Sequence, residues 1–195
     1  GDHVVATDDL YGGTYRLLRE VFEPLNIQTS FVDMSDPDAV TDAFTEDTAL
    51  LWVETPTNPL MRLVDIEALA ERAHAHDITV AVDNTFATPY LQQPLAHGAD
   101  LVLHSATKYL GGHSDLILGA VCTNSDEWAE KLRFQIKSTG AAPGPMDCFL
   151  TLRGTKTLHL RMEQHCSSAR RLAQMLNAHD KATRWPKSKC RTTAA

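Results

Sequence analysis

The sequence predicts an α/β protein with a mostly parallel sheet flanked by helices, and three observations lead to this class. Short apolar runs rich in β-branched residues alternate along the chain with segments of helical periodicity, an order typical of α/β proteins. Several of these runs stop abruptly in polar residues, as strands do at the edge of an open sheet where ligands bind. Hydrophobic residues make up 43% of the 195 positions, which is enough for a packed core.

The first half of the chain is expected to alternate strands with helices. Residues 1–5 are already strand-like, and two glycines after Tyr11 open a helix. Ser35, with Asp38 three residues later, resembles a capping box at the start of another helix. In order, we expect a helix over 15–25, a strand over 27–32, a helix over 35–44, a strand over 49–54 and a helix over 66–76.

The second half supplies further strands and then becomes helical. Apolar runs predict strands over 78–83, 101–104 and 116–123. A helix is expected over 127–137, and the stretch 146–178 is largely helical with a bend at Gly154. The basic segment 181–195 contains no acidic residue and no periodicity, so it is either an ordinary disordered tail or a foreign terminus.

The most informative segment is HSATKYLGGHSD, residues 104–115, which follows a predicted buried strand. Lys108 lies there between the hydroxyls of Ser105 and Thr107 and a pair of glycines. Such an amine can form an imine with a carbonyl group, while hydroxyls and free backbone N–H groups hold a phosphate. Pyridoxal 5′-phosphate (PLP) offers both groups. A lysine in a turn is more often a solvated surface charge, so the segment alone does not decide the matter.

Polar residues at other strand ends add weight to this interpretation. Asp83 ends an apolar run, where a carboxylate is costly to bury unless it meets a cation such as a protonated pyridine nitrogen. Asn58 follows the strand over 49–54 and offers an amide at the same edge. Tyr11 presents an aromatic ring at a helix start. Taken singly, these residues also fit a helix cap, turn chemistry before Pro59 and a half-buried tyrosine.

Composition excludes several other classes of protein. The formal net charge of −7 disfavours a nucleic-acid surface, and no apolar run approaches the roughly 18 residues of a membrane span. The start does not read as a signal peptide. Four cysteines without a C-x-x-C pair indicate reduced thiols in a cytoplasm, and nine histidines without ligand spacing predict no metal site. The dinucleotide and P-loop glycine motifs are absent, which disfavours a nucleotide-binding Rossmann module.

Taken together, the motifs resemble the Cys/Met-metabolism family of PLP-dependent enzymes. The resemblance covers about residues 1–179 and rests on the segments DDLYGGT, ETPTNP, VDNTF, SATKYLGGHSD and RGTKTL. It implies the large domain of an aspartate-aminotransferase-like (fold type I) enzyme of sulfur amino-acid metabolism. We accordingly divide the chain into a partial PLP-binding domain over 1–145, a helical link over 146–180 toward a C-terminal domain, and the tail over 181–195.

The resemblance also implies roles for the residues that match. Lys108 would form the internal aldimine and move protons at the α and β carbons of the substrate, for which it must be neutral; burial beside the cofactor is expected to favour that form. Tyr11 would stack on the ring and take part in proton transfer.

The remaining matches would bind the cofactor. Asp83 would hold the ring nitrogen and Asn58 the ring oxygen. Thr85 would pack against the ring face opposite the tyrosine, and Ser105 and Thr107 would bind phosphate oxygens.

Within the family, the resemblance is closest to cystathionine γ-lyases and γ-synthases, over the stretches 140–148 and 156–163. Gly13 stands where methionine γ-lyases place a cysteine, which disfavours that branch. The implied reaction is γ-elimination or γ-replacement on cystathionine, cysteine or an O-acylhomoserine. Cystathionine β-lyase and sulfhydrylase chemistry remain open, as does a catalytically silent fragment.

The resemblance also implies assembly into a homotetramer, and it implies segments beyond those matched in this chain. These are an N-terminal phosphate loop with a Tyr/Arg pair for the neighbouring subunit, and a C-terminal arginine for the substrate carboxylate. We therefore expect the chain to be incomplete at both ends, and the faces that the missing parts would cover to be apolar.

Overall fold

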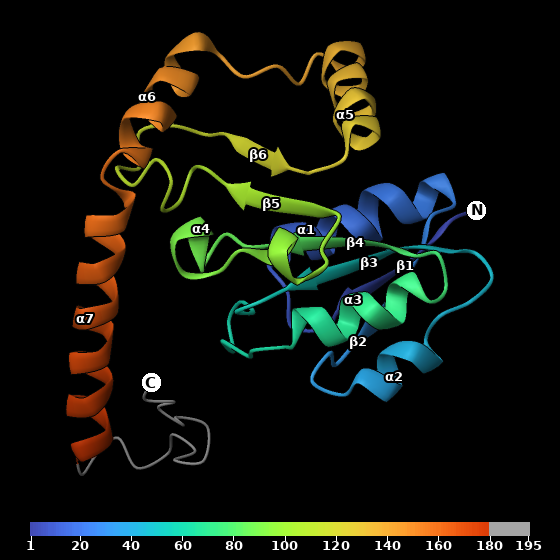
Figure 1. Cartoon of the computed structure of the whole chain (residues 1–195), viewed down its shortest axis with the longest axis horizontal. Helices are drawn as coiled ribbons and strands as arrows, with labels where there is room; N and C mark the ends of the chain where they lie inside the picture. The colour runs from blue at the N-terminus through green and yellow to red at the C-terminus, as the bar shows by residue number, and fades with distance from the viewer. Residues whose placement is uncertain (180–195) are drawn as a thin grey trace.

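A computed structural model describes residues 1–179, so the segment 181–195 considered above lies outside the described residues. Six strands form one sheet in the order β2-β1-β3-β4-β5-β6 (Figure 1). The neighbours from β2 to β5 are parallel, and β6 pairs with β5 antiparallel. The strands are β1 (His3–Thr7), β2 (Gln28–Val32), β3 (Thr48–Glu54), β4 (Thr79–Asp83), β5 (Leu101–Ser105) and β6 (Gly119–Cys122). The mostly parallel α/β architecture is confirmed.

Helices cover both faces of the sheet, as the nearly uninterrupted apolar strands require. On one face lie α2 (Pro37–Asp42) and α3 (Ile66–His74), which share a core cluster with Val5 and the inward residues of β3 and β4. On the other face, α1 (Gly12–Arg16) continues through a π-helical turn (Leu17–Phe22) and a 3₁₀ turn (Glu23–Leu25), and packs over Val4 and Ala6. Val4 and Ala6 of β1 thus belong to the core on one face of the sheet, and Val5 belongs to the core on the other face.

The connections place β1 between β2 and β3, second from one edge of the sheet. The chain runs outward from β1 to β2, returns across it to β3, and then continues in the other direction through β4 and β5. This reversal makes the gap beyond the carboxyl ends of β1 and β3 a topological switch point, the usual ligand site of open α/β sheets.

The predicted start of the second helix is wrong. Its cap is Asp36, whose Oδ1 accepts hydrogen bonds from the N–H groups of Asp38 (3.1 Å) and Ala39 (3.3 Å). Ser35 instead donates its own N–H and hydroxyl to Asp33. Both residues are good helix caps, so the pattern of residue types did not distinguish them.

Two predictions in the second half are also corrected. The strand expected over 116–123 shortens to β6, because Leu116 is buried against Leu158 and Met162 rather than aligned in the sheet. The C-terminal helix breaks between α6 (Pro145–Thr155) and α7 (Leu158–Ala178), whereas the expected bend, Gly154, lies inside α6. Gly154 is required for a close approach, since a Cβ there would lie 2.3 Å from the carbonyl oxygen of Gly111.

The helices after β6 extend away from the sheet. Figure 1 shows α5 (Asp126–Thr139) and α6 beyond the β6 edge and α7 standing alongside the sheet. Hydrogen bonds hold α7: Tyr90, in α4 (Thr88–Leu91), donates its hydroxyl to Glu163 at 2.8 Å. No residue of α5 is buried, and Met146, Phe149 and Leu152 of α6 are between 59% and 67% exposed. These helices therefore present apolar side chains without a covering layer among residues 1–179.

No helix within residues 1–179 is long and apolar enough to cross a membrane. Over the same range, no group of three or more His, Cys, Asp or Glu side chains is arranged to hold a metal ion. The described cysteines, Cys122, Cys148 and Cys166, carry free thiols.

Candidate functional site

Four neighbouring strands bring the polar residues singled out in the sequence to one edge of the sheet. Because β1, β3, β4 and β5 are parallel and adjacent, the segments that follow them meet at the same side. There they line a cavity of about 560 Å³. All seven residues predicted for the site line it: Tyr11, Asn58, Asp83, Thr85, Ser105, Thr107 and Lys108. Residues separated by almost one hundred positions are thus assembled into one site.

The lysine turn follows directly from the end of β5. The backbone N–H of Lys108 donates to the carbonyl of Ser105 (3.0 Å), and the N–H of Gly112 donates to the carbonyl of Lys108 (2.8 Å). Gly112 has a φ of +80°, a left-handed conformation that suits glycine. The Lys108 side chain is exposed at the cavity. The burial expected around this amine is therefore not provided by residues 1–179.

The end of β4 forms the floor of the cavity together with the start of the lysine turn. One carboxylate oxygen of Asp83 accepts the N–H of Thr85 at 3.0 Å, which leaves the other oxygen available to a cation. The Thr85 hydroxyl accepts the N–H of Ser105 at 2.8 Å. These two bonds connect the end of β4 to the end of β5 and fix the carboxylate relative to the lysine turn.

The other predicted residues differ in their exposure and in their hydrogen bonds. The Tyr11 ring is 49% exposed, and the Asn58 carboxamide lines the cavity between its neighbours. The Thr107 hydroxyl accepts the N–H of Leu118 at 3.1 Å and lies 3.5 Å from the Leu118 carbonyl. The bond that the Thr107 hydroxyl donates is long, so its O–H can turn to another acceptor.

Sequence reasoning missed Glu54, which lines the same cavity. It ends β3 in register with Asp83 and is only 5% exposed. Its two oxygens accept the N–H groups of Tyr11 and Asn58, each at 2.9 Å. Burial, together with the carboxylates of Asp83 and Asp9, raises the pKa of Glu54 to about 7 against the opposing effect of these two bonds. The rule that identified Asp83, an acid that ends a buried strand, applies equally to Glu54.

His104 lies close to the Asp83 carboxylate. It is 6% exposed, and its Nδ1 has no hydrogen-bond partner within residues 1–179. Burial lowers the pKa of His104, while the Asp83 charge opposes this shift. The ring therefore adds a largely neutral, partly unsatisfied group to the wall around Asp83.

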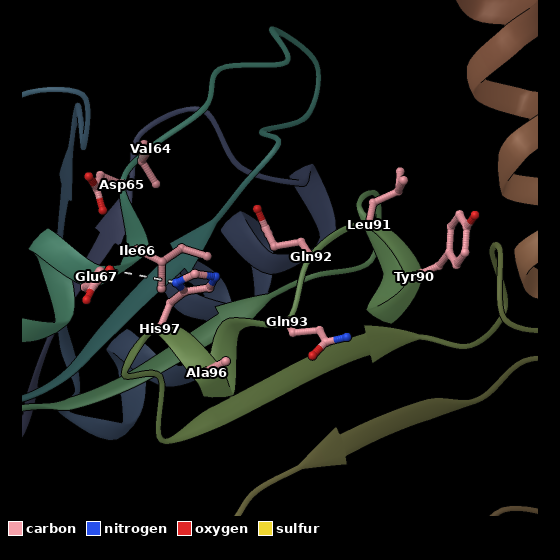
Figure 2. A pocket seen from close by; sticks show the side chains of 10 residues that line it. All are labelled: Val64, Asp65, Ile66, Glu67, Tyr90, Leu91, Gln92, Gln93, Ala96 and His97. Atoms are coloured by element: carbon pink, nitrogen blue, oxygen red, sulfur yellow. Dashed lines mark ion pairs between the residues drawn. The ribbon is translucent and has the colours of Figure 1, made fainter. Parts of the chain in front are cut away.

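A second cavity, of about 490 Å³, lies between the start of α3 and the segment containing α4 and Pro94–His97 (Figure 2). Several of its polar groups already have partners. Gln92 donates to the Thr55 carbonyl (3.1 Å) and the Asn84 Oδ1 (2.9 Å), and Glu67 lies 3.9 Å from His97. The strand-edge cavity, in which an amine, carboxylates and hydroxyls meet at the carboxyl ends of adjacent parallel strands, is the candidate site.

The sequence matches the family of Cys/Met metabolism PLP-dependent enzymes over residues 1–189. The chain belongs to this family. Among curated relatives, a probable cystathionine gamma-synthase of Herpetosiphon aurantiacus is 52% identical over 92% of the chain, and a cystathionine gamma-lyase of Dictyostelium discoideum is 50% identical over 94%. The crystal structure of cystathionine gamma-lyase from Lactobacillus plantarum complexed with L-serine matches 92% of the chain with a TM-score of 0.91 and 44% identity.

The chain spans about half the length of these members of the family. It covers 56% and 48% of the two curated relatives and 47% of the chain in the crystal structure. All the residues that line the cavity lie within the range matched by the family, residues 1–189.

Proposed function

We propose that the chain binds PLP at the strand-edge cavity and supplies the lysine-bearing site of an enzyme of sulfur amino-acid metabolism, of the cystathionine γ-lyase or γ-synthase type. The observation that carries the proposal is the convergence of an amine, a carboxylate, two hydroxyls and an aromatic ring on one cavity of about 560 Å³. This volume lies within the range of small-molecule sites in proteins.

The donor set fits PLP chemically. The Lys108 amine would join the cofactor's carbonyl carbon, and the free oxygen of Asp83 would pair with the ring nitrogen. Asn58 would donate to the ring oxygen, and Tyr11 would cover one ring face.

The phosphate would meet the hydroxyls of Ser105 and Thr107. The Thr85 methyl would pack against the ring, since its hydroxyl is used by the Ser105 N–H. When bound, PLP withdraws electrons from a substrate carbanion.

The residues of the chain would manage protons around that chemistry. Lys108, in its neutral form, would take the proton from the substrate's α-carbon, give it up again and then take one from the β-carbon, and the electron pair left there would expel the γ-substituent. The Tyr11 phenol, half exposed at the cavity mouth, would exchange protons with the substrate amine and the departing group. Addition of cysteine would then give replacement, whereas elimination would end when water releases a 2-oxo acid and ammonia.

We propose that the substrates are small amino acids, namely cystathionine, cysteine or an O-acylhomoserine. Free thiols at all three described cysteines suit a reducing compartment such as the cytoplasm. The uncovered apolar side chains of α6 and their neighbours support assembly into a homo-oligomer, a homotetramer in the complete protein. Light scattering during size-exclusion chromatography would measure that assembly; a monomeric complete protein would contradict it.

The test is the absorption spectrum of the 195-residue chain with added PLP, followed by borohydride reduction and peptide mapping. A new visible band and a reduced adduct on Lys108 are expected, and both should be lost in Lys108→Ala. An adduct that persists in the variant, or a chain that stays colourless, would contradict the proposed function. The colourless outcome would favour a catalytically silent chain. An adduct on Lys108 would justify turnover assays with cystathionine and activated homoserine esters.

A further inference from the structure

Glu54 joins the two loops that carry Tyr11 and Asn58. One carboxylate oxygen accepts the N–H of Tyr11, 43 residues away, and the other accepts the N–H of Asn58, each at 2.9 Å. The first loop follows β1 and the second follows β3, on either side of the switch point. A single side chain therefore sets the spacing of two cavity walls.

The geometry requires an acceptor at both ends of the side chain. A carboxylate has two oxygens that accept, whereas the carboxamide of glutamine turns a donor toward one of the two N–H groups. Charge-assisted bonds from backbone N–H groups to a carboxylate are also stronger than bonds between neutral groups. An ionised glutamate suits this position better than its neutral isostere for that reason.

Burying the negative charge of Glu54 beside other carboxylates costs free energy. Glu54 is 5% exposed and in register with Asp83, and the Asp9 carboxylate is the next nearby like charge. Lys108 is the cationic group that lines the same cavity. The acid bonds two loops that both carry cavity residues, so its position at this cost points to the site it borders.

Resting on the proposed function, we propose that Glu54 is a positioning residue that holds Tyr11 and Asn58 where they contact the cofactor. It acts through the backbone of these two residues. Its effect should be largest when both oxygens are free to accept. Protonation places a hydrogen on one oxygen and weakens one of the two bonds, so the effect should decline below about pH 7.

The experiment compares Glu54→Gln with the unmodified 195-residue chain and with Glu46→Gln. Glu46 is exposed before the other end of β3, so it provides the same change of charge away from the cavity. PLP dissociation constants are measured by absorbance at pH 6 and pH 8.5. Hydrogen exchange of the Tyr11 and Asn58 amides is measured without PLP. We expect the PLP affinity of Glu54→Gln to fall about tenfold at pH 8.5 and much less at pH 6. A tenfold loss is about what one buried N–H group without an acceptor would cost.

The two readouts separate this inference from the proposed function. If Glu54→Gln binds PLP like the unmodified chain, or loses affinity equally at both pH values, the positioning role is wrong. If the unmodified chain forms no adduct on Lys108, the proposed function fails. Hydrogen exchange still tests whether Glu54 holds the backbone of Tyr11 and Asn58 in place. Faster exchange at both amides in Glu54→Gln but not in Glu46→Gln would support it, and unchanged exchange would overturn it.

Discussion

Asp83 can be tested separately from the bond that orients it. Because Oδ1 accepts the Thr85 N–H at 3.0 Å, Asp83→Asn keeps an oxygen for that bond and removes only the charge. We expect PLP affinity to fall at least tenfold, since an opposite charge no longer meets the ring nitrogen. Absorbance titration measures the change, with the exposed Asp42→Asn as the control. Equal affinities would mean that the partner of the ring nitrogen lies elsewhere.

Gly13 controls where the Tyr11 ring can lie. A Cβ at Gly13 would lie 2.3 Å from Cε1 of Tyr11, whereas a Cβ at Gly12 would meet nothing within 4 Å. Gly13→Ala should therefore displace the ring, which is free to move because it is 49% exposed. We expect several-fold weaker PLP binding with little loss of stability. Gly12→Ala is the control, because it is the same substitution at the same helix start. Similar PLP affinities in the two variants would contradict the prediction.

The position of a single site residue could be predicted where a strand ends in one polar residue. Lys108 and Asp83 each follow a buried apolar run, so their place at the sheet edge followed from the sequence. Glu54 follows the same rule and was missed, because its role depends on two N–H donors that only the folded loops bring together. The exposure of the lysine amine depends on what surrounds the cavity, which no local pattern encodes.

At the scale of elements, Arg161 connects α7 to the lysine turn. Its guanidinium donates to the carbonyls of Tyr109 (2.6 Å) and Gly154 (2.7 Å). An amine cannot reproduce this fork, so Arg161→Lys should cost about 1 kcal/mol of unfolding free energy. It should also speed hydrogen exchange in the turn after Lys108. Urea unfolding and exchange measure both effects; Arg170→Lys, at an exposed position of α7, is the control. Identical behaviour of the two variants would show that the fork does not hold the turn.

The elements that the sequence predicted best are those defined by their own residues. Most of the parallel strands are apolar runs, so their existence and order along the chain could be read directly. The short β6 and the break after α6 could not, because they depend on distant partners. Leu116 packs against α7 instead of extending the strand, and Gly154 is set by the close approach of Gly111.

At the scale of the whole molecule, the buried titratable groups change the stability of the fold in opposite directions as pH rises. Burial lowers the pKa of His3 and His104 below their usual 6.5. The unfolded chain then binds more protons than the folded one as pH falls through 6.5, so these groups favour unfolding in acid. Glu54 acts in the other direction. The folded chain keeps its proton up to about pH 7, while the unfolded chain releases it near 4.5, so its contribution to stability falls as pH rises between these values.

Glu54→Gln should remove the second of these contributions and leave the first. We expect the variant to gain stability relative to the unmodified chain as pH rises from 5 to about 7, and the difference to level off above that. Urea unfolding at pH 5, 6, 7 and 8 gives the four differences, and Glu46→Gln should show no such trend. Stability curves that run parallel would contradict the buried-acid assignment. A relative gain in stability combined with weaker PLP binding at high pH would mean that the ionised carboxylate opposes folding while it orders the site.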